Sequence, residues 1–274
     1  MAEKDLTMED DWGAKGAQAT GAQVQKFIKS QFKALHDKDT TLQNQLDSLN
    51  SDLGDANPQL RAATDGCFVA FTQKSDNYQR AVPWWEWPAK EKAGEVADGV
   101  LVLIDGQAPI IVSPTQTQLF WSKNAIAVNA DTGGDFNKAY VDYTGKTRTA
   151  AIMGKATELF GEEEENWVKY APAWCNAYDR RHDKGDGTMI GMGPGKWWLP
   201  SIAELITIWK HKYAINQCLS VISGASQLSE SWYWSSTELS ATNAWALTLS
   251  TGNLYDWGAK VAGSRYVRAV AAFH

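Results

Sequence analysis

The sequence predicts an α+β fold for residues 65–274, preceded by a separate helical segment over residues 20–57. Three observations predict it. Short apolar runs bounded by turn residues indicate antiparallel strands, and segments of helical periodicity lie between them. A seven-residue apolar repeat occurs only near the N-terminus. Fourteen tryptophans, 13 of them after residue 80, indicate that the C-terminal part forms an aromatic-rich body with a full core.

The N-terminal part contains two kinds of sequence. Residues 1–19 are polar and rich in Gly and Ala, so we expect them to be flexible. Residues 20–57 contain an apolar stripe with a seven-residue repeat, and this seam is narrower than the apolar stripe of a globular helix. The seam consists of Ile28, Phe32, Leu35, Leu42, Leu46, Leu49 and Leu53, and Asp39 is its polar break. We expect a coiled coil that assembles a homotrimer, with a dimer or a single helix packed on its own domain as alternatives.

Strand signals dominate residues 65–150. Cys67–Phe71 is one apolar run, and Gly99–Ile104 is another. The second is followed by Asp105-Gly106 and by Pro109–Val112, which predicts a β-hairpin because Asp-Gly favours the tight turn that joins two strands. Two further strands are predicted, at Gln118–Trp121 and Ala125–Val128.

Helix signals follow. Residues 149–181 have near-helical spacing, with a break around Pro172, and the Gly-rich residues 182–196 predict a loop. Ser201 and Glu204 have the spacing of a capping box, so a helix should begin there and run to about Tyr213. A second short helix is predicted over residues 214–221, and strands are predicted from Trp232 onward.

Composition argues against several classes of function. The net charge is -6 and no concentrated basic face is evident, so we expect no nucleic-acid partner. There is no signal-peptide pattern and no run of about 18 apolar residues, so we expect no membrane insertion. Three cysteines without metal-ligand spacing indicate reduced thiols. The four histidines are too scattered for a zinc site. Whether calcium binds near Asp179, Asp183 and Asp186 stays open.

Six segments in the C-terminal part carry a family resemblance: Ala173–Tyr178, Gly195–Leu205, Tyr233–Glu238, Ala244-Trp245, Gly252-Asn253 and Tyr266–Val270. They resemble the C-type-lectin-like fold of the formylglycine-generating-enzyme type, and more narrowly the variable proteins that retroelements diversify in phages and bacteria. The resemblance is strong over residues 170–274, weaker over 65–170, and does not include the first 64 residues.

The resemblance implies two helices packed around small, irregular antiparallel sheets. It also implies a variable region at about residues 232–274, in which adenine-directed mutagenesis changes a surface patch and leaves the surrounding frame intact. A formylglycine-generating enzyme needs two reactive cysteines near its C-terminal end. The last cysteine here is Cys218, so we expect no enzyme activity, no catalytic residues, no cofactor and no metal.

The expected ligand-binding patch combines a strand and a loop. In Ala244–Ser250 every second residue should face solvent, and residues 254–265 follow neither helix nor strand periodicity, which predicts a loop bearing an exposed Tyr and Trp. The expected patch consists of Ala246, Thr248, Ser250, Thr251, Tyr255, Asp256, Trp257, Gly258, Ser264 and Arg265. Arg268 lies between apolar residues, and we expect it to be structural, paired with Glu204 or Glu238.

The expected function is recognition of a host-cell surface protein or glycan by an oligomer carried on a phage tail and made in the host cytoplasm. A bacterial cell surface is the alternative location. Two other functions remain open: a fixed structural protein that uses the same patch for assembly, and an oxidase of the parent fold.

Overall fold

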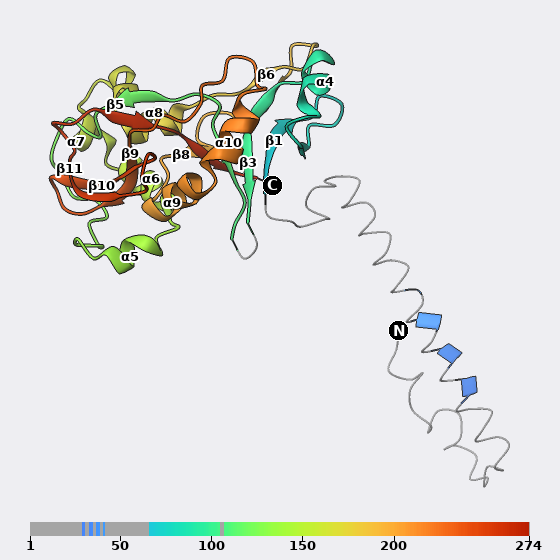
Figure 1. Ribbon diagram of the computed structural model, residues 1–274, viewed down its shortest axis with the longest axis horizontal. Helices are drawn as coiled ribbons and strands as arrows, with labels where there is room; N and C mark the ends of the chain where they lie inside the picture. Colours follow the sequence, from blue (N-terminus) through green and yellow to red (C-terminus); the bar gives the residue numbers. More distant parts are fainter. Residues whose placement is uncertain are drawn as a thin grey trace, which may run out of the picture. The chain divides into compact units, whose positions relative to one another are not determined.

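A computed structural model describes residues 29–30, 33–34, 37–38, 41, 66–104 and 107–273, apart from the side chains of Asp256 and Trp257 (Figure 1). The chain divides into two units, Met1–Pro58 and Gln59–His274. In the first unit the described residues are helical and exposed. The predicted seam residues, the coiled coil and the flexible residues 1–19 lie outside the described residues, so these expectations stay predictions.

The C-terminal unit is a mixed α/β fold with several antiparallel sheets. The larger sheet has the order β2-β1-β3-β4-β13-β8 and every described pairing in it is antiparallel. Its strands are β1 (Gly66–Thr72), β2 (Gln79–Val82), β3 (Ala97–Leu103), β4 (Ile110–Val112), β8 (Trp197–Trp198) and β13 (Val270–Ala272). The predicted hairpin is confirmed by the pairing of β3 with β4, and its Asp105-Gly106 turn lies outside the described residues.

The five-stranded sheet has the order β11-β10-β9-β12-β5, and Figure 1 shows β9, β10 and β11 side by side. Its only parallel pairing among the described strands joins β12 to β9. The strands are β5 (Thr117–Leu119), β9 (Trp232–Glu238), β10 (Asn243–Thr248), β11 (Leu254–Ala259) and β12 (Arg265–Val267). A small hairpin is formed by β6 (His182–Asp183) and β7 (Met189–Ile190).

Three sequence expectations about loops and strands are wrong. The predicted loop over 254–265 contains β11, because pairing with β10 supplies hydrogen bonds that no local pattern reveals. The predicted loop over 182–196 contains the small β6–β7 hairpin. The predicted strand Ala125–Val128 has no regular structure. Its backbone is held instead by a carboxylate, since Val128 N and Asn129 N both donate to Glu238.

The helices are short. They are α4 (Trp87–Lys92), α5 (Phe136–Tyr140), α6 (Gly145–Met153), α7 (Ala156–Phe160), η3 (Glu164–Lys169), α8 (Ala171–Ala177), α9 (Ile202–Lys210) and α10 (Lys212–Leu219). The helical prediction for 149–181 is therefore right in type, but the segment is divided, and Pro172 lies in the first turn of α8. The predicted capping box is confirmed at α9, where Ser201 N donates to Glu204 Oε2 at 2.7 Å.

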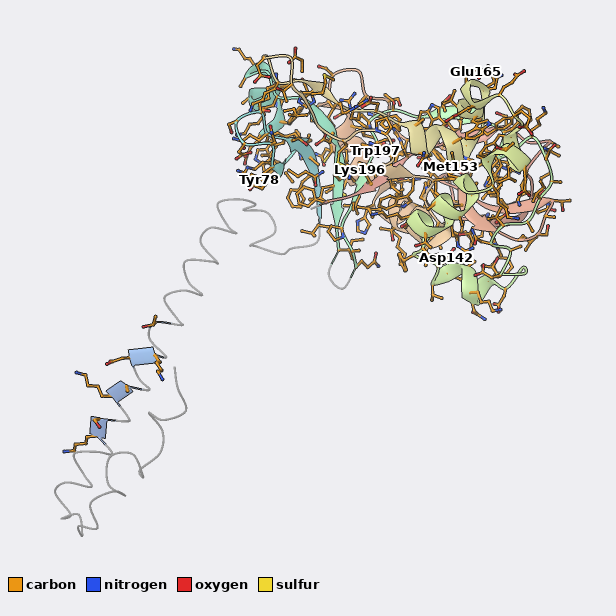
Figure 2. All side chains as sticks on the ribbon, turned by 180° about the vertical axis from the view of Figure 1, so that it is seen from behind. Tyr78, Asp142, Met153, Glu165, Lys196 and Trp197 are labelled. Atoms are coloured by element: carbon orange, nitrogen blue, oxygen red, sulfur yellow. The ribbon has the colours of Figure 1, made fainter. Side chains whose placement is uncertain are left out.

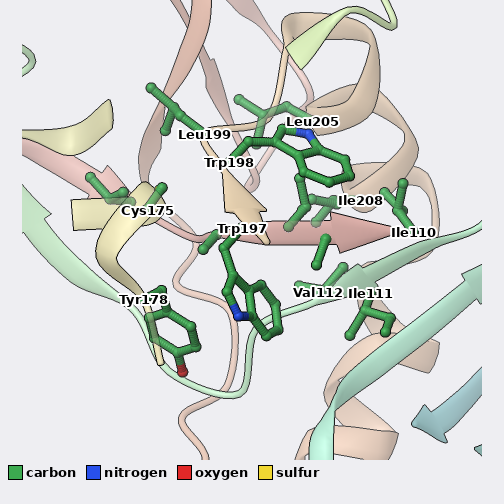
Figure 3. Close-up of a cluster of buried hydrophobic side chains, with 14 of the residues drawn as sticks. Ile110, Ile111, Val112, Cys175, Tyr178, Trp197, Trp198, Leu199, Leu205 and Ile208 are labelled. Atoms are coloured by element: carbon green, nitrogen blue, oxygen red, sulfur yellow. The ribbon is translucent and has the colours of Figure 1, made fainter. Parts of the chain in front are cut away.

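Buried tryptophans connect the sheets to helices and to segments distant in the sequence. Trp197 and Trp198 lie among side chains of β4, α8 and α9 in the core (Figure 3). Several indole N–H groups donate to acceptors far away in sequence: Trp121 to Ser235 O, and Trp245 to Thr132 Oγ1. Each such tryptophan buries a large apolar area and also fixes one long-range polar contact, which specifies how the sheets and loops pack.

The prediction that Arg268 pairs with Glu204 or Glu238 is wrong. Arg268 is buried, and its guanidinium donates to two backbone carbonyls, Ser113 O at 3.0 Å and Ser226 O at 2.7 Å. Burial lowers the pKa of Arg268 to about 10. The two carboxylates have other partners, because Glu204 caps α9 and Glu238 binds Lys260.

Asp98 in β3 should make the stability depend on pH. It is buried, and burial raises its pKa to about 6 although Thr72 Oγ1 donates to it at 2.7 Å. Such a group stabilises the fold fully below its unfolded pKa, and this contribution is lost as the pH rises through the folded pKa. We expect the free energy of unfolding to fall by about 3 kcal/mol at most between about pH 4 and pH 6. Urea unfolding of Asp98→Asn should show a smaller pH slope than the wild type. Equal slopes would contradict this assignment.

Candidate functional site

The register of the five-stranded sheet gathers several of the predicted patch residues on one face. Ala246 of β10 lies opposite both Trp234 of β9 and Tyr255 of β11, and Thr248 lies opposite Trp232. Directly opposed residues project from the same side of a sheet. One face of β9, β10 and β11 therefore presents two tryptophans and a tyrosine above Ala246 and Thr248.

Arg265 of β12 joins the same face. Its neighbour Tyr266 pairs with Tyr233 in parallel register, and their rings stack on the other side of the sheet with centroids 5.4 Å apart. Because side chains alternate along a strand, Arg265 projects toward Trp232 and Trp234. We call Trp232, Trp234, Tyr255 and Arg265 the aromatic face.

The guanidinium of Arg265 is held by three rings. Its carbon lies 4.7 Å from the ring centroid of Trp234, 5.2 Å from that of Tyr255 and 5.7 Å from that of Trp232. The rings of Trp232 and Tyr255 also touch, with centroids 5.4 Å apart. A cation placed over aromatic rings is attracted by their electron-rich faces, which fixes the guanidinium in place.

The guanidinium of Arg265 has hydrogen-bond donors that no described residue satisfies. Among the described residues no carboxylate pairs with this guanidinium, and its buried Nε has no hydrogen-bond partner. Partial burial lowers the pKa of Arg265. A half-buried guanidinium with free N–H groups is suited to bind an acceptor-rich ligand, because the ligand would satisfy donors that the fold leaves unpaired.

Trp234 forms the floor of the aromatic face. Its side chain is buried, and its indole N–H donates to Leu119 O at 3.0 Å. Gly258 of β11 leaves the space that this ring occupies, since a Cβ there would lie 2.6 Å from the ring and 2.6 Å from Ala244 O. Gly258, expected in the patch, thus acts as a spacer for the tryptophan and is itself buried.

The predicted patch residues differ in exposure. Ser250, Thr251, Tyr255 and Ser264 are exposed and Arg265 is half-buried. The expectation that Ala246 and Thr248 face solvent is wrong, because both are buried. Both faces of β10 are covered: Trp245 and Leu247 pack into the core, and the aromatic rings of the neighbouring strands cover the other side. Asp256 and Trp257 lie in β11, and their side chains lie outside the described residues.

The patch expected from the sequence did not include Trp232 and Trp234, which the structure places in the candidate site. The signal was available, since two tryptophans two positions apart in a strand must share a face. The spacing alone did not indicate a binding site, because it does not show which strands lie beside β9. Only the order β11-β10-β9-β12 brings Tyr255 and Arg265 to the two sides of β9 and β10.

Lys260 lies within the expected patch region, yet it is fully buried. Its Nζ pairs with Glu238, donates to Ile126 O at 3.0 Å and lies 4.4 Å from the ring centroid of Trp121. Glu238 also accepts from the backbone N–H groups of Val128 and Asn129. This buried ion pair ties the turn after β11 to β9 and to the segment before α5, so Lys260 serves the frame.

Within the described part of the chain, no three His, Cys, Asp or Glu side chains are grouped so that they could hold a metal ion. The thiols are poorly disposed to react, since burial raises the pKa of Cys67 and of Cys218 to about 12 and that of Cys175 well above its usual value. Asp183 is engaged by its own loop and accepts from Gly185 N and Gly187 N. No described helix has the length and apolar character needed to cross a membrane.

Comparison with known proteins assigns no family to this chain. No protein-family model matches the chain, and no curated protein matches it. The crystal structure of a fimbrial protein from Bacteroides ovatus ATCC 8483 is similar to part of the chain, with a TM-score of 0.39 and 16% sequence identity. The match covers 60% of this chain and 35% of that protein. A similarity of this size carries no argument about function.

Proposed function

We propose that this protein binds a ligand through the aromatic face, within a C-type-lectin-like domain of the kind diversified by retroelements. The observation that supports it is the half-buried guanidinium of Arg265, surrounded by three aromatic rings and without a described acceptor. Tyr, Trp and Arg are the residues that contribute most binding energy at protein interfaces. Here they occur together, and Tyr255 and Ser264, the residue before Arg265, are exposed.

The composition of the face indicates the chemistry of the ligand. Free guanidinium donors suit a carboxylate or another acceptor-rich group, and flat rings suit the faces of sugars or planar side chains. A glycan or a protein loop on a host-cell surface would supply both. The proposed function needs no chemical step, since complementarity alone provides recognition.

Presentation in several copies would strengthen a weak single-site contact. If residues 20–57 form the predicted trimer, three aromatic faces act together and the avidity exceeds the affinity of one face. We place such an oligomer on a phage tail, with a bacterial cell surface as the alternative.

A double substitution tests the proposal. We expect Tyr255→Ala together with Arg265→Ala to weaken binding to susceptible cells about 100-fold or more, because each hot-spot residue contributes about 2 kcal/mol or more. The matched control is Tyr213→Ala with Lys210→Ala, which removes an exposed tyrosine and a cation from the α9–α10 region. Binding to cells would be measured by flow cytometry, and folding by thermal unfolding.

Unchanged cell binding by a folded Tyr255→Ala, Arg265→Ala variant would overturn the assignment of the site. Diversification has its own test, which is to sequence the DNA downstream of the gene. A near-copy of the codons for residues 232–274 beside a reverse transcriptase, differing only at adenines, would support it. Absence of such a copy would favour a structural protein of fixed sequence.

A further inference from the structure

A pocket of about 430 Å3 opens between the larger sheet and α9. It does not include any residue of the aromatic face. Apolar side chains from β3, β4, β8 and β13 form much of its wall. Polar groups come from the segment between β3 and β4, from the residues before and at the start of α6, and from α9. Its lining is Val102, Ile104, Gln107, Ala108, Pro109, Ile110, Tyr143, Lys146, Trp198, Glu204, Thr207 and Ala272. The volume and the mostly apolar wall are typical of small-molecule sites.

Glu204 is the buried acidic group among the residues that line this pocket. Its side chain lines the pocket although the residue is only 5% exposed. Two neutral donors approach the carboxyl group, Ser201 N at 2.7 Å and Trp198 Nε1 at 3.2 Å. No basic side chain of the described residues forms an ion pair with it. Neutral donors alone hold this buried carboxyl group, so an ammonium ion bound beside it would offset the cost of burying its negative charge.

The other charged groups around Glu204 do not supply that charge. Asp142, labelled in Figure 2 on the segment between α5 and α6, is paired with Arg148 at 2.7 Å. Its negative charge adds to burial in raising the pKa of Glu204 to about 7. Lys146 is exposed at the rim, with its Nζ 5.8 Å from the ring centroid of Trp198. Tyr143, the remaining titratable group of the lining, is also exposed.

We propose that this pocket binds a small primary amine with an apolar body, its ammonium group on the carboxylate of Glu204. The apolar body would contact Val102, Ile110 and Ala272, and the ring of Trp198 would lie beside the cation. This site is independent of the aromatic face, so it can be tested separately.

The affinity of this pocket for an amine should depend on pH. An ammonium ion binds the ionised carboxyl group, and Glu204 becomes protonated as the pH falls through its pKa of about 7. Affinity for the amine should therefore fall about tenfold for each pH unit below this value. Above it the affinity should level off until the amine itself loses its proton. A neutral ligand of the same shape should show no such dependence.

Three matched probes test the charge: phenethylamine, 2-phenylethanol and phenylacetate, titrated into the full-length protein by calorimetry at pH 8. We expect phenethylamine to bind at least tenfold more tightly than the alcohol, and phenylacetate most weakly. At pH 6 the advantage of the amine should shrink about tenfold. Tightest binding of phenylacetate, or no binding of any probe, would overturn the proposal.

Three variants locate the site. Glu204→Gln keeps a side chain that can complete the capping box, and it should remove the preference for the amine while the alcohol still binds. Ala272→Phe fills the pocket and should abolish binding of both. Lys146→Ala removes a like charge at the rim and should leave amine binding equal or tighter. An amine preference that survives in Glu204→Gln, or loss of amine binding in Lys146→Ala, would contradict the proposed site.

Discussion

Replacing Lys260 with Met should lower the free energy of unfolding by about 3–5 kcal/mol. The substitution leaves Glu238 fully buried without its cation and removes the contact of the ammonium group with the ring of Trp121. Urea unfolding followed by tryptophan fluorescence would measure the loss. The aromatic face lies on the same sheet as Glu238. Ligand binding should therefore weaken as the fraction of folded protein falls.

Two variants serve as controls for Lys260. Lys155→Met removes the cation of an exposed pair, Lys155 with Glu158 at 3.7 Å, and should change stability by less than about 0.5 kcal/mol. Adding Glu238→Gln to Lys260→Met should restore part of the loss, because the buried group is then uncharged. A loss below about 1 kcal/mol for Lys260→Met would show that the pair is not a structural element.

Substituting Gly258 with Ala should impair both stability and ligand binding. The new Cβ would lie 2.6 Å from the ring of Trp234 and from Ala244 O, so either the ring or the strand must move. Such overpacking costs about 1–3 kcal/mol. Displacing Trp234 also shifts the nearest ring under Arg265, and we expect the affinity for cells to fall about tenfold or more because the hot-spot residues act as one cluster.

Gly263 provides a matched control. It lies near the same ring, but a Cβ there would be 3.8 Å from Trp234 and 3.6 Å from Ala259 O, which is ordinary contact. Gly263→Ala should therefore keep both stability and binding. Equal behaviour of the two variants, measured by urea unfolding and flow cytometry, would refute the spacer role of Gly258.

Local signals in the sequence predicted local structure well. Ser201 and Glu204 define the start of α9 because a capping box needs only four consecutive residues. The β3–β4 hairpin was predicted for a similar reason, since its turn residues and its two strands adjoin. The strand β11 was missed because its hydrogen bonds go to β10, and a segment without periodicity gives no sign of that partner.

The candidate site was predicted only in part. Tyr255 and Arg265 were selected because aromatic and basic residues in a presumed loop favour binding, and the sheet register brings them together. Ala246 and Thr248 were assigned to the surface by alternation, a rule that fails when both faces of a strand are covered. The burial of Lys260 depends on Glu238 in another strand and on Trp121 far away in sequence. No local pattern contains this information.

The two strands nearest the end of the chain enter different sheets. β12 lies between β9 and β5 in the five-stranded sheet, while β13 lies between β4 and β8 in the larger one. Neither sheet can be completed during synthesis until these strands have left the ribosome, so folding must wait for late, long-range pairing. A substitution within residues 232–274 that prevents β12 or β13 from pairing in its sheet should yield unfolded chains that proteolysis removes. Substitutions in this segment are therefore tolerated only where β12 and β13 can still pair within their two sheets.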